Sequence, residues 1–193
     1  IEAGDIQGVN HGLASLLQLI MTAKDAQLPV LTIQDKPAFG YRGLMLDCAR
    51  HFWTVDELKE TLDHMAFFKL NTLHMHLTDN QAWRLSMDKY PDLVKEGTYY
   101  YDFPELSGKY YSKEDLKEIV TYAGTRGIEI IPEVDLPGHS IALLAALPEL
   151  SCRGGKFEAT PEERDWNKRK RGNENMICIG NPQSFAFAED VID

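Results

Sequence analysis

Three short apolar runs, each followed by polar side chains and then by a helical pattern, constrain the fold of this 193-residue sequence more than any other feature. The runs cover residues 43–47, 72–77 and 128–135. Apolar residues at helical spacing separate them, so the predicted order is strand, helix, strand, helix, strand, helix. Strands that alternate with helices form parallel sheets, which carry functional side chains at the carboxyl ends of the strands. The pattern predicts an α/β fold: a partial (β/α)8 TIM barrel with its first three β/α units, residues 43–47 being a buried strand.

Helix-start signals support the helices of this alternation. Thr54 and Glu57 have the spacing of a capping box, in which each side chain bonds a backbone amide of the other residue. Ser112 caps a second helix, which Gly127 should end. Asn181 followed by proline predicts a further helix start.

The first 40 residues precede the alternation. Apolar side chains at helical spacing predict one helix: Leu13, Leu16, Leu17, Ile20 and Met21. Residues 30–33 predict a short strand, and a turn follows. We expect residues 1–40 to be a connecting helix and strand and residues 41–193 to contain the barrel units; that the connection comes from a preceding domain is implied only by the family resemblance given below.

Composition excludes several classes of protein. With 44% hydrophobic residues the chain is too apolar to be disordered, and a net charge of −10 argues against binding to nucleic acid. No apolar run reaches the ~18 residues of a membrane span. The one basic run, Lys168 to Arg171, is interpreted as a solvated loop tip. Cys152 and Cys178 flank a polar stretch. The sequence supports two interpretations equally: a disulfide between them, which needs an oxidising compartment, or two separate thiols.

Two pairs of strand residues are candidates for chemistry. His74 and His76 share one strand face, as in metal-dependent barrel hydrolases. Two hydrogen-bonded interior histidines are the favoured interpretation, because no carboxylate or lysine pattern elsewhere completes a metal ligand set. Glu133 and Asp135 also share a face, with their carboxylates roughly 6 to 7 Å apart. Paired acids at that separation serve glycoside hydrolysis, so from the residues alone they are the predicted catalytic pair; the alternative is that they hold loops or bind ligand hydroxyls.

Other residues at strand ends favour a sugar ligand. Arg50 lies three residues after Asp47, and its five N–H donors suit paired hydroxyls; a plain ion pair with Asp47 is the alternative. His139 leaves a tight turn, where it either sets the pKa of an acid catalyst or is structural. The aromatic residues that could stack on sugar rings or fill the core are Trp83, Tyr99, Tyr100, Tyr101, Tyr110 and Tyr111.

Three longer segments carry a family resemblance. They are Tyr41-Arg-Gly-Leu-Met-Leu-Asp-Cys-Ala-Arg-His-Phe52, Lys69-Leu-Asn-Thr-Leu-His-Met-His-Leu-Thr-Asp-Asn-Gln-Ala-Trp-Arg84 and Gly127-Ile-Glu-Ile-Ile-Pro-Glu-Val-Asp-Leu-Pro-Gly-His139. In this order they resemble the family 20 glycoside hydrolases, the β-N-acetylhexosaminidases. The resemblance implies a (β/α)8 barrel that removes terminal β-linked N-acetylglucosamine or N-acetylgalactosamine with retention of configuration, without metal or cofactor.

The resemblance also implies substrate-assisted catalysis, in which the acetamido oxygen of the substrate attacks the anomeric carbon. The family's general acid/base lies in a His-x-Gly-Gly-Asp-Glu motif on strand four, and this motif is absent from the sequence. We therefore expect residues 41–193 to be the N-terminal part of the catalytic barrel, truncated before strand four, with the Asp-Glu pair following Asp193 and no turnover by this chain alone. Glu133 and Asp135 then become supporting or substrate-binding residues.

Four positions match family residues with known roles. Arg50 is similar to the arginine that binds the O3 and O4 hydroxyls of the terminal sugar. Asp79 and His139 resemble the polar network that supports the acid/base, and Asp135 resembles a carboxylate beside it. The sequence departs from the family at two places. Many members have Asp-Asp-Gln-Gly-Trp where this sequence has Asp79-Asn-Gln-Ala-Trp83, and Met75 replaces an aromatic residue.

The partners implied are a carbohydrate substrate and either the remainder of the enzyme or a second copy, because an incomplete barrel leaves open sheet edges. The resemblance implies an exported enzyme, whether secreted, periplasmic or lysosomal. Two other interpretations are a barrel that binds sugars or partners without catalysis, and a metal-dependent hydrolase that uses His74 and His76.

Overall fold

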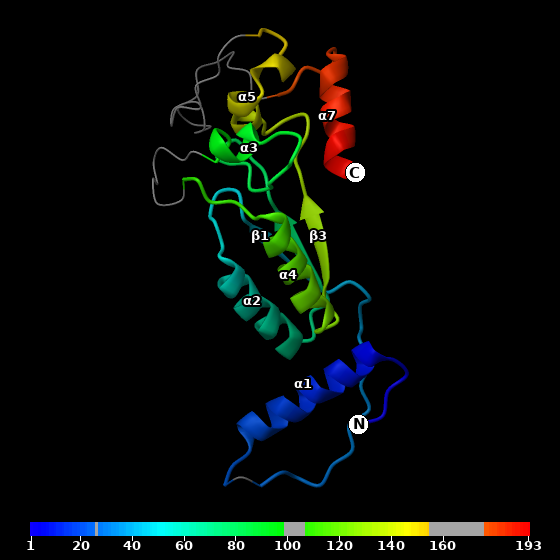
Figure 1. The fold of residues 1–193 in the computed structure, drawn as a ribbon. Helices are drawn as coiled ribbons and strands as arrows, with labels where there is room; N and C mark the ends of the chain where they lie inside the picture. Colours follow the sequence, from blue (N-terminus) through cyan, green and yellow to red (C-terminus); the bar gives the residue numbers. More distant parts are fainter. Residues whose placement is uncertain (26, 99–106, 155–175) are drawn as a thin grey trace. The chain divides into compact units, whose positions relative to one another are not determined.

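The computed structural model describes residues 1–25, 27–98, 107–154 and 176–193 (Figure 1). These residues form two compact units. The first contains Ile1–Leu46, Trp53–His74 and Leu116–Ile131, and the second contains Asp47–Phe52, Met75–Asp115 and Pro132–Asp193.

The predicted alternation of strands and helices is confirmed. The elements are α1 (Ile6–Thr22), β1 (Gly43–Asp47), α2 (Val55–Phe67), β2 (Thr72–His76), α3 (Asp92–Lys95), α4 (Lys113–Gly124), β3 (Glu129–Glu133), α5 (Ile141–Ala146), the 3-10 helix η2 (Pro148–Leu150) and α7 (Pro182–Ile192). None of the helices in the described ranges combines the length and the apolarity that crossing a bilayer requires.

The three strands form one parallel sheet in the order β1-β2-β3. Before the strands, the N–H of Asn71 donates to the carbonyl of Arg42, and at their ends the N–H of Cys48 donates to the carbonyl of His76, each at 2.9 Å. When the residue numbers of the paired groups rise together along both strands, the strands are parallel. The hydrogen bonds between β2 and β3 follow the same order, so this pair is parallel as well. The carboxyl ends of all three strands therefore lie at one edge of the sheet.

Burial differs between the middle strand and the outer strands. Leu73 and Met75 of β2 are fully buried, as the alternating pattern predicts. The prediction that residues 43–47 form a buried strand is wrong: Leu44 and Met45 of β1 are 37% and 55% exposed. The reason is position, because β1 is an outer strand of the three and only β2 has a described strand on each side.

The N-terminal segment contains the predicted helix but not the predicted strand. Helix α1 begins after Asp5, whose side chain accepts from the amide of Gly8. Residues 30–33 form no strand, and Val30 is fully exposed. A short extended run needs a neighbouring strand to pair its backbone groups, and apolar composition alone does not supply one.

Both predicted caps, at the starts of α2 and α4, are present. The hydroxyl of Thr54 accepts from the amide of Glu57 at 3.3 Å, and the Glu57 carboxylate accepts from the Thr54 amide at 2.7 Å. Ser112 and Asp115 make the same reciprocal pair before α4. Helices α2 and α4 lie side by side (Figure 1), joined by ion pairs from Lys59 to Glu118 and from Arg126 to Asp63.

The second unit has an apolar core to which α5 and α7 contribute. Its buried members are Trp83, Leu93, Leu143, Leu144, Leu147, Leu150, Ile177 and Phe187. Trp83 packs on Phe187, and Tyr111 stacks on Phe52. Trp83 and Tyr111 are therefore core residues and do not offer a surface for sugar stacking, whereas Tyr110 is 38% exposed. The aromatic residues at 99–101 and the basic run at 168–171 lie outside the described residues.

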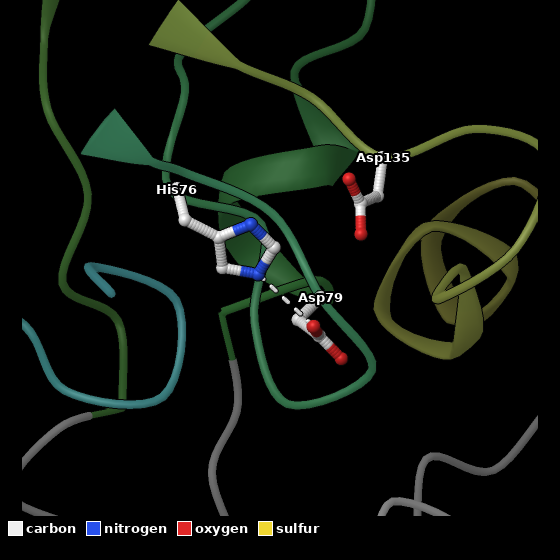
Figure 2. Close-up of side chains that lie close together, drawn as sticks. All are labelled: His76, Asp79 and Asp135. Carbon is white, nitrogen blue, oxygen red and sulfur yellow. Dashed lines mark hydrogen bonds and ion pairs between the residues drawn. The ribbon is translucent and has the colours of Figure 1, made fainter. Parts of the chain in front are cut away.

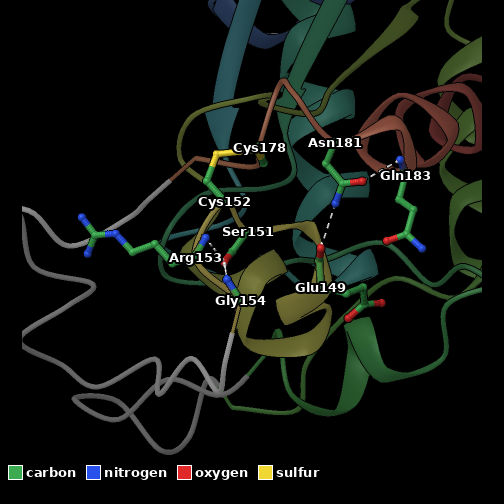
Figure 3. The surroundings of a disulfide bond; sticks show 8 residues. All are labelled: Glu149, Ser151, Cys152, Arg153, Gly154, Cys178, Asn181 and Gln183. Atoms are coloured by element: carbon green, nitrogen blue, oxygen red, sulfur yellow. Dashed lines mark hydrogen bonds between the residues drawn. A yellow bond between two sulfur atoms is a disulfide. The ribbon is translucent and has the colours of Figure 1, made fainter.

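The structure settles the cysteine pairing that the sequence left open. Cys152 and Cys178 form a disulfide across 26 residues of sequence (Figure 3). Hydrogen bonds hold both ends: the Ser151 hydroxyl accepts from the amide of Gly154 at 2.8 Å, and the Asn181 amide group donates to the carbonyl of Glu149 at 2.9 Å. Asn181 also caps α7, as predicted from the proline that follows it. The disulfide thus joins the end of η2 to the start of α7.

Removing this disulfide should destabilise the protein. A cross-link over 26 residues restricts the unfolded chain by about 3 kcal/mol. We expect a Cys152→Ala, Cys178→Ala double variant to lose about that free energy of unfolding in urea titrations. Dithiothreitol should lower the stability of the parent protein and leave the double variant unchanged. Equal sensitivity of both proteins to the reductant would contradict the assignment.

Candidate functional site

A buried carboxylate at the end of β2 organises the candidate site. The Asp79 side chain is 1% exposed. It accepts hydrogen bonds from Arg50 Nη2 at 2.5 Å, His76 Nε2 at 3.0 Å, His139 Nδ1 at 3.0 Å and the Asn80 amide at 2.6 Å. Figure 2 shows the bond from His76. All five residues belong to the second unit, and they bring together the segments that follow β1, β2 and β3.

Arg50 spans two carboxylates and still faces solvent. Its Nη1 donates to Asp47 Oδ2 at 2.6 Å while its Nη2 donates to Asp79, so the ion pair with Asp47 considered from the sequence is present. The other oxygen of Asp47 accepts from the amides of Ala49 and Arg50 at 3.1 and 3.0 Å. With 46% of its side chain exposed, the guanidinium is fixed in direction and open to a ligand.

His76 links two carboxylates inside the site. Its Nε2 bonds Asp79, and its Nδ1 bonds Glu133 Oε1 at 2.8 Å. Because a carboxylate only accepts, both ring nitrogens donate and the ring is an imidazolium. The hydrogen bond to Asp79, opposed by burial and helped by Glu133, raises the pKa of His76 to about 9. The side chain is 8% exposed, so the cation is a buried part of the network.

The same contacts keep Asp79 ionised. Burial by itself raises the pKa of a carboxyl group. At Asp79 this effect is outweighed by hydrogen bonds from His76, the Asn80 amide and His139 and by the charge of Arg50, and the pKa lies below its usual value.

Glu133 and Asp135 both belong to the network around Asp79. Strand β3 ends at Glu133, whose carboxylate bonds His76 Nδ1, and the Asp135 amide donates to the Thr78 hydroxyl at 3.0 Å. Burial, together with the neighbouring Glu133 carboxyl group, raises the pKa of Asp135. Asp135 also lies beside His76 and Asp79, so the two acids are placed to support the network as well as to contact a ligand.

The turn after β3 aims His139 at Asp79. His139 has φ of 54°, a left-handed conformation that non-glycine residues rarely adopt. The next residue, Ser140, holds the turn by donating from its hydroxyl to the carbonyls of Pro137 and Gly138 at 2.9 Å each. Half of the His139 side chain is exposed. The strained turn thus places one ring nitrogen on Asp79 and leaves the rest of the ring facing outward.

Comparison with known proteins identifies the family. The sequence model of the glycosyl hydrolase family 20 catalytic domain matches residues 39–193. The chain belongs to glycoside hydrolase family 20. A beta-hexosaminidase of Porphyromonas gingivalis is 39% identical over 196 residues, covering 96% of this chain and 24% of that protein. An N,N'-diacetylchitobiase of Vibrio harveyi is 35% identical over 206 residues, covering 96% of this chain and 23% of that protein.

Solved structures of family 20 enzymes share the fold. A β-N-acetylhexosaminidase of Bacteroides fragilis superposes with a TM-score of 0.85 at 32% identity, over 100% of this chain and 36% of that one. An exo-β-N-acetylglucosaminidase of Vibrio harveyi, in complex with N-acetylglucosamine, gives 0.82 at 35% identity, over 99% and 31%. The chain therefore spans less than half the length of these family 20 relatives.

The pairing of His74 with His76 as metal ligands finds no support in this family 20 chain. Within the ranges the structure describes, the side chains that could surround one ion are His76, Asp79 and Asp135, whose ligand atoms lie within 4.8 Å of one another (Figure 2). His74 is not among them. Both ring nitrogens of His76 bond carboxylates, Nδ1 to Glu133 and Nε2 to Asp79, so His76 is a member of the hydrogen-bonded network.

Sequence reasoning found four members of this family 20 network and missed the role of His76. Arg50, Asp79 and His139 come together as expected, and Asp135 lies beside them. The sequence could not predict the bond from His76 to Glu133. The register between β2 and β3 decides which residues face each other, and that register has no local signal. The available signal was a histidine at the end of a strand three residues before a carboxylate.

The pKa of His76 predicts how stability depends on pH. Its folded pKa of about 9 exceeds the ordinary 6.5, so its stabilising contribution is complete below pH 6.5 and is lost as pH rises through 9. The loss should be on the order of 3 kcal/mol. We expect His76→Gln to flatten the free energy of unfolding across this window in urea titrations. The exposed His64→Gln is the control, and an unchanged slope in His76→Gln would contradict the imidazolium.

Proposed function

We propose that this chain is the part of a β-N-acetylhexosaminidase that binds the terminal sugar, and that Arg50 holds the O3 and O4 hydroxyls of that sugar. One observation carries the proposal: in a family 20 chain, Arg50 is fixed between Asp47 and Asp79 at the carboxyl ends of the strands while 46% of its side chain stays exposed.

The chemistry of Arg50 suits a neutral polyol. A guanidinium has five N–H donors in a rigid plane, and the bonds to Asp47 and Asp79 use two of them. Charge-assisted hydrogen bonds to hydroxyls give both affinity and orientation. The two carboxylates neutralise the guanidinium charge in the free protein, so the site favours hydroxyl groups over a second anion.

We propose substrate-assisted cleavage with retention of configuration. The acetamido oxygen of the substrate forms the new bond to the anomeric carbon as the bond to the leaving oxygen breaks and that oxygen receives a proton from an acid. Water then attacks the same carbon, the bond to the acetamido oxygen breaks, and the residue that gave the proton takes one from the water, so two inversions leave the configuration retained. Ionised Asp79 fixes Nδ1 of His139 as a donor. Nε2 of His139 would then bond the acid/base group. The His-x-Gly-Gly-Asp-Glu motif that carries this group in the family is absent from the sequence. We therefore propose that this chain positions the substrate and the acid/base group and does not turn over substrate alone.

The remaining proposals concern the whole protein. The three β/α units are proposed to open a (β/α)8 barrel, whose later strands or a second copy would cover the exposed Leu44 and Met45 of β1. The Cys152–Cys178 disulfide supports an oxidising location, secreted, periplasmic or lysosomal. The match of relatives named beta-hexosaminidase and diacetylchitobiase supports N-acetylhexosamine as the substrate.

Substitution of Arg50 tests this function. In the whole protein that contains this chain, Arg50→Met should lower kcat/KM for an aryl N-acetylglucosaminide by about 100-fold or more, because two hydrogen bonds from a charged donor are lost. The matched control is Arg153→Met, which removes an exposed arginine and should leave kcat/KM within twofold.

Three outcomes would contradict the proposal. Unchanged kcat/KM in Arg50→Met would remove Arg50 from the sugar site. Binding of N-acetylglucosamine by the whole protein without hydrolysis would favour a non-catalytic sugar-binding barrel. Hydrolysis by the 193-residue chain alone, abolished by Glu133→Gln, would restore Glu133 as a catalytic residue.

A further inference from the structure

Arg84 is the most deeply buried charged residue near the site, and the function proposed above does not use it. Its relative exposure is 0%. Its amide donates to the carbonyl of Leu77 at 3.0 Å and its carbonyl accepts from the Tyr111 amide at 2.8 Å, so its backbone is fixed on both sides. Removing a guanidinium from water is costly unless its donors are satisfied. The partners of Arg84 therefore show what its burial accomplishes.

The Arg84 guanidinium bonds the peptide groups that lead into Arg50. Nε donates to the carbonyl of Cys48 at 3.1 Å, and Nη2 donates to the carbonyl of Ala49 at 3.1 Å. Nη1 donates to the carbonyl of Lys109 at 2.7 Å. Cys48 and Ala49 are the two residues immediately before Arg50. One side chain thus holds both carbonyls of the turn that carries the proposed sugar-binding residue.

The opposite side of this turn is held as firmly. Asp47 Oδ1 accepts from the amides of Ala49 and Arg50, and the carbonyl of His76 accepts from the amides of Cys48 and Ala49 at 2.9 and 3.2 Å. The turn is therefore fixed through its amides by Asp47 and β2 and through its carbonyls by Arg84. The direction in which the Arg50 side chain leaves the turn depends on both sets of bonds.

The ring of Phe52 lies beside the Arg84 guanidinium. The Arg84 guanidinium carbon lies 5.5 Å from the Phe52 ring centroid, and Phe52 stacks on buried Tyr111 with centroids 4.8 Å apart. Arginine alone among the basic residues presents several donors in one rigid plane. Lysine carries its three donors on a single nitrogen at the end of a flexible stem, and methionine has none, so neither reproduces the three separate nitrogens with which Arg84 reaches its carbonyls.

We propose that Arg84 is a positioning residue for Arg50: by holding the carbonyls of Cys48 and Ala49 it sets the direction of the Arg50 guanidinium and thereby the recognition of the sugar hydroxyls. The inference rests on the proposed function of Arg50. Displacement of a binding group by about 1 Å costs on the order of 100-fold in rate, so loss of this support should be visible in substrate selectivity.

The test compares an aryl N-acetylglucosaminide with its 4-deoxy analogue, which lacks one hydroxyl that Arg50 would bind. In the whole protein, kcat/KM should favour the complete sugar by about 100-fold or more. We expect Arg84→Met to reduce this preference at least tenfold, with kcat for the 4-deoxy analogue within about threefold of the parent. Arg153→Met should keep the full preference, and the double variant Arg50→Met, Arg84→Met should have the same preference as Arg50→Met.

The outcomes separate this inference from the function on which it rests. If Arg50→Met keeps the preference, the sugar-binding role of Arg50 fails and the positioning role fails with it. If Arg50→Met loses the preference and a folded Arg84→Met keeps it, the positioning role alone is overturned. Should Arg84→Met not fold, Arg84→Lys decides: a preference reduced at least threefold supports the inference, and a full preference overturns it.

Discussion

The buried carboxylate of Asp79 is the interaction on which the arrangement of the site depends. An ionised group that is 1% exposed persists only where donors surround it. Here the donors come from three segments: Arg50 after β1, His76 at the end of β2 and His139 after β3. The requirement to compensate one charge therefore fixes the positions of three side chains that follow three different strands.

Charge balance within the network explains how so many acids coexist. Asp47, Asp79, Glu133 and Asp135 gather around one arginine and the His76 imidazolium. Burial and the neighbouring Glu133 raise the pKa of Asp135, which eases the repulsion among the four acids. Two cations thus offset part of the negative charge of the site in a chain of net charge −10, an arrangement that suits a neutral, hydroxyl-rich ligand and gives no advantage to a basic surface.

Local signals in the sequence predicted local structure well. The Thr54 and Ser112 caps, the Asn181-Pro182 helix start and all three strands are where their patterns indicated, because each depends on residues within one turn or one strand. Features that depend on partners far along the chain were not predictable in this way. Residues 30–33 lack a strand to pair with, β1 is exposed by its place in the sheet, and Cys152 needs Cys178 brought within bonding distance.

The candidate site shows the same division. The order of polar residues after each strand indicated Arg50, Asp79, Asp135 and His139, since parallel strands place their carboxyl ends together. The bond from His76 to Glu133 depends on the register between β2 and β3, and the support of Arg84 for the turn before Arg50 depends on backbone carbonyls that carry no sequence signal. Contacts between a side chain and a distant backbone group are thus the part of a site that sequence patterns reveal least.

The protonation state of His76 is the decisive observable for this site, because the ring lies between the carboxylates of Asp79 and Glu133 and both contacts favour a cation there. The measurement is a titration of the imidazole nitrogens of His76 by ¹⁵N NMR, assigned with His76→Gln. We expect both nitrogens to carry protons at neutral pH and the midpoint to lie near 9. A neutral ring at neutral pH, with a midpoint at or below about 6.5, would contradict a buried imidazolium in this network.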